Sequence, residues 1–160
     1  MRRSLGLVSR FLAGAGAIVV ASGLGACNND VTDTDLEKRI ITLPEVRKEL
    51  ASKTPPLLID ARSRQDFSAE HISGAVNMGV TSVSGNRGDT DPRLLAYPVL
   101  IVYGQDPASA GARALGKRMI ASGYDDLRFF AGGLSAWKQA GLPTTRPAEK
   151  TPASSASPSQ

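Results

Sequence analysis

The sequence predicts a single α/β domain, in which a central and mainly parallel sheet is flanked by helices on both faces. Three short apolar runs, at residues 57–60, 99–103 and 127–130, alternate with segments that have helical periodicity. The first run stays apolar until its last residue, as do strands that are covered on both faces. A strand, a helix and a strand joined by connections this short pair in parallel through a right-handed crossover.

The first elements of this domain are predicted from local signals. Residues 39–41 form a brief strand, and Thr42 is followed three residues later by Glu45, with Pro44 between them. This arrangement is a capping box with proline in the first helical turn, so we expect a helix that runs from there to about Ser52.

The longest predicted helix runs from about Pro107 to Ser122. Asp106 is its expected N-cap, Pro107 is its first residue, and Gly123 ends it. One face of this helix is apolar and carries Ala108, Ala112, Leu115 and Met119. A last helix begins after a sharp turn at residues 132–133 and carries Trp137, which we expect to pack in the core.

The first 26 residues are predicted to be a lipoprotein signal peptide. Residues 1–10 carry three arginines and no acid, and residues 11–26 carry no charge and are rich in small and apolar side chains. The alternative is an uncleaved membrane helix, which needs about 20 apolar residues. Because the run at 11–26 is shorter and contains four glycines, we favour cleavage.

Cys27 is the only cysteine of the chain, and it follows Leu24-Gly25-Ala26, a sequence that resembles a lipobox. The resemblance implies that the Cys27 thiol forms a thioether to diacylglycerol and that the new amino terminus is acylated, so that several acyl chains anchor the protein in a membrane. We therefore expect a location in a bacterial cell envelope, with the domain facing the periplasm or the cell exterior. Residues 27–35 are the lipidated cysteine and a short tether, residues 36–146 are the domain, and residues 147–160 are a disordered tail.

The charge of the chain argues against one class of partner. The 160 residues carry a formal charge of +4, but the signal peptide contributes three arginines, so the mature chain has 16 basic and 15 acidic residues and a formal charge of +1. No basic stripe with interleaved aromatic residues remains. We therefore expect no binding to nucleic acid.

Five motifs of the predicted domain resemble the rhodanese family. They read LIDAR at residues 58–62, QDF at 65–67, EHISGAVN at 70–77, FAGGLSAW at 130–137 and AGLP at 140–143. The resemblance covers the domain from about residue 41 to residue 143 and implies a rhodanese-like fold. It also implies that, in active members, a cysteine directly follows a strand that ends in Val-Tyr, and that the amides of a loop leading into a helix hold its persulfide.

This chain departs from the family pattern at the position of that cysteine. Tyr103 is followed by Gly104, and the loop that comes next is about two residues longer than the sulfurtransferase loop. Glycine offers no atom to which sulfur can bind, and Cys27 lies outside the fold with its thiol expected to be alkylated. We therefore expect no catalytic residue in the loop, no persulfide transfer and no cysteine-based phosphatase chemistry.

The favoured function is a rhodanese-like module that binds an envelope protein or a small anion at this loop. The alternative is an enzyme, either related to sulfurtransferases or hydrolytic, that uses the loop as an anion cradle with a thiol supplied by a partner. The candidate loop residues are Gly104, Gln105, Asp106, Ala108 and Ser109, with Asp60, Arg62 and Arg113 in support.

Several of these residues have competing interpretations. Asp60 and Arg62 form either a structural ion pair, which we favour, or part of a ligand crevice at the carboxyl end of a strand. The charge of Asp106 disfavours tight anion binding, although free N–H groups at the helix end could hold an anion weakly. A catalytic couple of Ser109 and His71 is disfavoured, because His71 falls in a motif with a structural role. No cofactor and no metal are expected, since one histidine and a lipidated cysteine are too few ligands for zinc.

Overall fold

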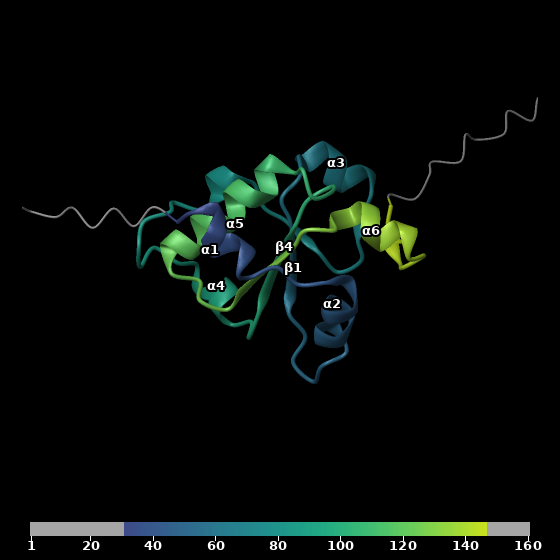
Figure 1. Cartoon of the computed structure of the whole chain (residues 1–160), viewed down its shortest axis with the longest axis horizontal. Coiled ribbons are helices and arrows are strands. Elements are labelled where there is room, and N and C mark those ends of the chain that lie inside the picture. The colour runs from purple at the N-terminus through teal and green to yellow at the C-terminus, as the bar shows by residue number, and fades with distance from the viewer. Residues whose placement is uncertain (1–30, 147–160) are drawn as a thin grey trace, which may run out of the picture.

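The computed structural model describes residues 31–146, which form one domain around a four-stranded sheet (Figure 1). The predicted signal peptide, Cys27 and the predicted tail at residues 147–160 lie outside the described residues. In Figure 1 the described chain begins on the left side of the domain and ends on its right side.

Every pairing within the four-stranded sheet is parallel. The strand order is β3 (Val76–Asn77), β1 (Leu57–Asp60), β4 (Leu100–Tyr103) and β5 (Leu127–Phe130). A separate antiparallel pair joins β2 (His71–Ile72) to β6 (Thr144–Thr145). The strand expected at residues 39–41 is reduced to one parallel bridge between Ile40 and Phe129, because Thr42 already caps the next helix.

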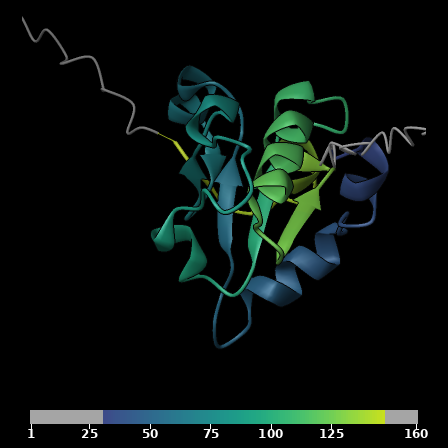
Figure 2. The ribbon, with the colours of Figure 1, turned by 90° about the vertical axis from the view of Figure 1, so that its left-hand side faces the viewer.

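Six α-helices and one 3-10 helix accompany the strands in the described part of the chain, and the first two of them precede β1. They are α1 (Asp33–Glu37), α2 (Leu43–Leu50), α3 (Arg64–Ala69), η1 (Val80–Ser82), α4 (Pro92–Leu95), α5 (Ala110–Ser122) and α6 (Gly133–Gln139). Helices α1, α4 and α5 cover one face of the sheet, and α2 and α6 cover the other (Figures 1 and 2). This arrangement confirms the predicted α/β class. Within residues 31–146, no helix combines the length and the apolarity that crossing a bilayer requires.

The alternation of side chains along the strands creates two hydrophobic cores. Leu57 belongs to the core under α5, whereas its neighbour Leu58 belongs to the core under α2 and α6. Tyr103 lies in the second core, where its hydroxyl accepts a hydrogen bond from the Ile72 N–H at 3.1 Å. Trp137 is buried in the same core, as the sequence predicts.

The capping box at the start of α2 is confirmed. The hydroxyl and the N–H of Thr42 each donate to the Glu45 carboxylate at 2.7 Å. The bond from the Thr42 N–H, and after it the bond from the Thr42 hydroxyl, lower the pKa of Glu45. Its carboxylate therefore stays charged and caps the helix. The helix ends at Leu50, before the predicted end at Ser52.

The start of α5 differs from the prediction. The helix begins at Ala110 with Ser109 as its N-cap, so Asp106 is not the cap and Pro107 is not the first helical residue. The Asp106 Oδ1 instead accepts a hydrogen bond from the Ala108 N–H at 2.9 Å. An aspartate that bonds to the N–H two residues ahead makes a turn as readily as it caps a helix, and the sequence pattern is the same in both cases.

The folded part of the chain begins before the predicted boundary at Leu36. Helix α1 starts at Asp33, inside the predicted tether, and is opened by a capping box of its own. Leu36 is fully buried against Gly116 of α5, where an added Cβ would lie 2.8 Å from Leu36 Cδ1. Polar composition placed the boundary too late, because the polar residues of α1 are the cap and the exposed face of a helix.

We expect Leu36→Ala to lower the free energy of unfolding by about 3 kcal/mol, because truncating a fully buried leucine leaves a cavity. Urea unfolding of the mature chain, followed by Trp137 fluorescence, measures this change. Lys38→Ala is the control, since the Lys38 side chain is 70 % exposed, and it should change the value by less than about 0.5 kcal/mol. An unchanged value for Leu36→Ala would mean that α1 does not unfold with the domain.

Candidate functional site

The predicted loop connects β4 to α5 at the carboxyl edge of the parallel sheet. Its first residue, Gly104, is buried. A Cβ at this position would lie 2.7 Å from Ser109 Oγ and 2.9 Å from Ala112 Cβ, closer than non-bonded atoms pack. The loop therefore has no room for a side chain at Gly104 unless its neighbours move.

The Ser109 hydroxyl occupies the centre of the loop. Its Oγ accepts hydrogen bonds from the Gln105 N–H at 2.9 Å and from the Asp106 N–H at 3.1 Å. Two backbone donors that could hold an anion are thus used within the loop itself. The Asp106 Oδ1 lies 3.4 Å from the same hydroxyl, which adds negative charge at this point.

The first turn of α6 fixes the other side of the loop. The Leu134 N–H donates to the Gly104 carbonyl and the Ser135 N–H donates to the Gln105 carbonyl, each at 2.9 Å. This approach depends on Gly133, which has a φ of 60° and whose added Cβ would lie 2.5 Å from the Gly104 oxygen. The sharp turn expected at residues 132–133 is present, and it holds the loop backbone in place.

Asp60 and Arg62 form the structural ion pair that the sequence favoured. Asp60 is fully buried, and Arg62 Nη2 lies 2.7 Å from its Oδ2. The same guanidinium donates to the Glu70 carbonyl at 2.5 Å and to Gln105 Oε1 at 3.2 Å. Arg62 thus joins the end of β1 to the loop.

The buried Asp60 carboxylate also affects Tyr103. Burial of the Tyr103 hydroxyl, and after it the charge of Asp60, raise the pKa of this hydroxyl well above its usual value of 10.

Glu70 has a role that the sequence analysis did not assign. Its carboxylate accepts hydrogen bonds from Lys138 Nζ at 2.6 Å, the Thr144 hydroxyl at 2.8 Å and Arg146 Nη2 at 2.7 Å. These bonds, the one from Lys138 first, lower the pKa of Glu70 to about 2. Its partners are 68, 74 and 76 residues away in the sequence, so no local pattern could have revealed this cluster.

A pocket of about 380 Å³ opens beside the loop. It is lined by Ala61, Arg62, Ser63, Asp66, Gly104, Gln105, Ser109, Gly111 and Ala112. Of the predicted site residues, Arg62 and three loop residues line the pocket, whereas Asp60, Asp106 and Ala108 do not. The sequence analysis missed Ser63 and Asp66, whose side chains are joined by a hydrogen bond of 2.6 Å.

Arg113 does not support the loop, and that prediction was wrong. Its guanidinium lies 3.6 Å from Glu37 Oε1 and 3.9 Å from Asp33 Oδ1, and its Cζ lies 5.9 Å from the centroid of the Phe129 ring. It therefore ties α5 to α1. One residue along a helix turns the side chain by about 100°, which carries Arg113 away from the pocket that Ala112 lines.

His71 makes structural contacts, as predicted. Its Nδ1 lies 2.8 Å from the Phe67 carbonyl oxygen, and the two rings stack with centroids 3.8 Å apart. Within residues 31–146, no hydrogen bond joins His71 to Ser109, and no three histidine, cysteine, aspartate or glutamate side chains are grouped to hold a metal ion.

Comparison with known proteins identifies the family. A family model described as a rhodanese-like domain matches residues 42–140. The chain belongs to this family. The rhodanese-like domain is 32 % identical over 108 residues to thiosulfate sulfurtransferase GlpE of Pseudomonas putida, a match that covers 66 % of this chain and 86 % of that protein. The chain is therefore related to sulfurtransferases.

Two solved structures resemble the rhodanese-like domain. A thiosulfate sulfurtransferase from Pseudomonas aeruginosa is 26 % identical with a TM-score of 0.55, and the match covers 67 % of this chain and 20 % of that chain. The BH2092 protein from Bacillus halodurans has a TM-score of 0.58 at 17 % identity, and the match covers 71 % of this chain and 81 % of that chain. The second likeness concerns the fold alone.

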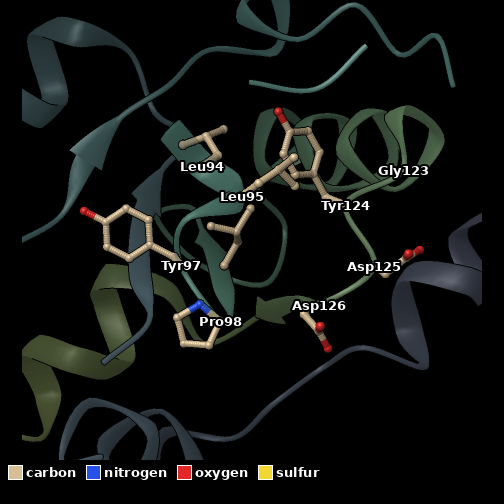
Figure 3. A pocket seen from close by; sticks show the side chains of 9 residues that line it. Leu94, Leu95, Tyr97, Pro98, Gly123, Tyr124, Asp125 and Asp126 are labelled. Carbon is tan, nitrogen blue, oxygen red and sulfur yellow. The ribbon is translucent and has the colours of Figure 1, made fainter. Parts of the chain in front are cut away.

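A second hollow lies at the amino edge of the sheet in this rhodanese-like domain (Figure 3). It has a volume of about 200 Å³ and is lined by Leu94, Leu95, Tyr97, Pro98, Leu100, Gly123, Tyr124, Asp125 and Asp126. It lies where β4 and β5 begin, whereas the loop follows the last residue of β4. None of the predicted site residues lines it, so the pocket beside the loop is the candidate site.

We expect Glu70→Gln to lower the free energy of unfolding at pH 7 by about 1 kcal/mol, because an amide cannot pair with the partly exposed Lys138 and Arg146. The folded-state pKa of Glu70 is lowered from 4.5 to about 2, so the contribution of the carboxylate is complete above pH 4.5 and is lost as the pH falls toward 2. The difference between the two proteins should therefore shrink with falling pH in urea unfolding.

The control for this prediction is Glu49→Gln in α2, since Glu49 forms no ion pair within the described residues. A difference between Glu70→Gln and the unchanged protein that stays constant from pH 7 to about pH 2 would contradict the role of the charged carboxylate.

Proposed function

We propose that this protein is a cell-envelope lipoprotein whose rhodanese-like domain is inactive as a sulfurtransferase and binds a partner protein at the pocket beside the loop. The observation that carries the proposal is the buried backbone of Gly104 at the position of the family cysteine. Sulfur cannot bind to glycine. The Ser109 hydroxyl also accepts hydrogen bonds from two backbone N–H groups that would otherwise stabilise a thiolate or persulfide.

A protein partner suits this pocket better than a small anion. Arg62 is paired with the buried Asp60, so its charge is already compensated. The carboxylates of Asp66, at the pocket, and Asp106, in the loop, repel an anion. The exposed Gln105 side chain is neutral: its Oε1 accepts from Arg62 and its Nε2 donates to Ser135 at 3.0 Å, which leaves one N–H and one lone pair for the backbone of a bound peptide.

We expect residues 28–160, which contain the whole described domain and lack Cys27, to release no sulfur from thiosulfate in the presence of cyanide above the buffer blank. The reason is that this part of the chain has no thiol. Turnover would overturn the proposal and favour the alternative of an enzyme, which the relationship to GlpE suggests.

Variants of the loop test why activity is absent. Gly104→Cys alone should stay inactive and be less stable, since its side chain meets Ser109 and Ala112. Gly104→Cys combined with Ser109→Gly removes the contact with Ser109, the closer of the two, and frees two N–H groups, so weak turnover is expected. Ser109→Gly alone is the control without a thiol. Equal activity in the single and double cysteine variants would mean that Ser109 does not block the cradle.

We expect Cys27→Ser to move the full-length protein from the membrane fraction of the cell to a soluble fraction, because the acyl chains are the proposed anchor. Asn29→Ser, two residues away, is the matched control and should stay with the membrane. Retention of Cys27→Ser in the membrane fraction would contradict the lipoprotein proposal while leaving the loop chemistry unaffected.

A further inference from the structure

We infer that the face of the domain around Val31 rests on a phospholipid surface, where Arg87 and Arg118 contact headgroup phosphates. The inference rests on the proposed lipid anchor at Cys27 and adds to it the orientation of the domain. Figure 2 is viewed from this side of the molecule.

The short distance between anchor and domain is the first reason. Only residues 28–30 separate Cys27 from Val31. An extended chain spans at most about 3.5 Å per residue, so the Cα atoms of Cys27 and Val31 lie within about 14 Å of each other. A domain of this size has a radius of gyration of about 13 Å. With so short a connection, the surface beside Val31 must lie close to the headgroups when Cys27 is lipidated.

The shape of this surface is the second reason. An open hollow of about 530 Å³ adjoins Val31 and is formed by α5, η1 and the segment that follows η1. Most of the residues that line it are small or apolar, and two are cationic. The lining residues are Val31, Val80, Ser84, Gly85, Ala114, Lys117, Arg118 and Ala121. Small side chains allow a flat surface to approach the backbone closely.

The third reason is a pair of arginines, of which Arg118 lines the hollow and Arg87 follows the lining residue Gly85 by two positions. Arg118 is exposed, and its side chain runs beside Gly85, where an added Cβ would lie 2.9 Å from Arg118 Cγ. Arg87, two residues after Gly85, is also exposed. Neither arginine forms an ion pair within the described part of the chain. Lys117 differs, because its Nζ lies 3.2 Å from Asp33 Oδ1. The two arginines are therefore the cations available to phosphate groups.

The turn that carries Arg87 is held firmly on α5. The Gly85 N–H donates to the Ser122 hydroxyl at 3.1 Å, and the Gly88 N–H donates to the Ser122 carbonyl at 2.9 Å. Ser122 is fully buried, and Gly88 has a left-handed φ of 87° that the turn requires. Asp89 is the acidic residue nearest in sequence to Arg87, and it forms no ion pair within the described residues.

This orientation brings the candidate pocket near the membrane. Gly111, which lines the pocket, and Arg118 lie seven residues apart on the same side of α5, which is about 10 Å along the helix. A partner that enters the pocket is then one that lies at the membrane surface.

Chemical coupling to a bilayer tests the orientation. The mature chain is joined through Cys27, its only thiol, to a maleimide lipid in nanodiscs of phosphatidylethanolamine and phosphatidylglycerol that contain a gadolinium-chelate lipid. The NMR amide signals of Gly85, Gly88 and Arg118 should lose several-fold more intensity than those of Gly141 and Thr144, near the other end of the described chain. Equal loss at both ends would overturn the inference.

Charge variants test the headgroup contacts. Arg87→Gln combined with Arg118→Gln should reduce the difference between the two ends by about threefold or more, as should high salt. Arg47→Gln combined with Lys48→Gln removes the same charge from α2 and should have no effect. If the intensity difference between the two ends is the same in the Arg87→Gln and Arg118→Gln double variant as in the unchanged protein, the proposed arginine contacts are overturned. Because the coupling is chemical, neither failure bears on lipidation in cells or on sulfurtransferase activity.

Discussion

The packing of the Gly104 backbone between α5 and α6 is the constraint on which the candidate site depends. Ser109 and Ala112 occupy the volume in which a side chain would stand, and the Leu134 N–H holds the Gly104 carbonyl from the other side. A residue with a Cβ would force these elements apart. The glycine at position 104 and the closed form of the loop are therefore one structural feature, since the second is possible only because of the first.

A chain of polar contacts connects this loop to the end of the domain. Asp60, buried at the end of β1, pairs with Arg62, and Arg62 reaches both the Gln105 side chain and the Glu70 carbonyl. The Glu70 carboxylate in turn binds side chains of α6 and of the segment that contains β6. A buried charge is costly unless it is paired, so Asp60 and Arg62 must keep this geometry. This requirement fixes the position of Arg62 in the wall of the pocket.

Helix α5 links the two surfaces to which we assign partners. Its first turn borders the pocket, and its later turns border the face near Val31. On the α1 side it is fixed by Leu36, which packs against Gly116, and by the ion pairs of Arg113 and Lys117. Under the proposed lipid anchor at Cys27, α5 would present the pocket to partners at the same membrane surface.

The sequence alone determined the class of the fold, the parallel strands, the capping box of α2 and the absence of a cysteine after Tyr103. These features depend on local patterns or on the identity of a single residue, which the order of the amino acids states directly. It misplaced the start of α5 and the start of the domain, because Asp106 and the acidic residues of α1 fit a cap, a turn or a tether equally well. Only the tertiary structure decided that Ser109 fills the loop, that Arg113 faces α1 and that Glu70 joins segments about 70 residues apart. Such contacts are set by how elements distant in the chain pack together, and no local pattern encodes that packing.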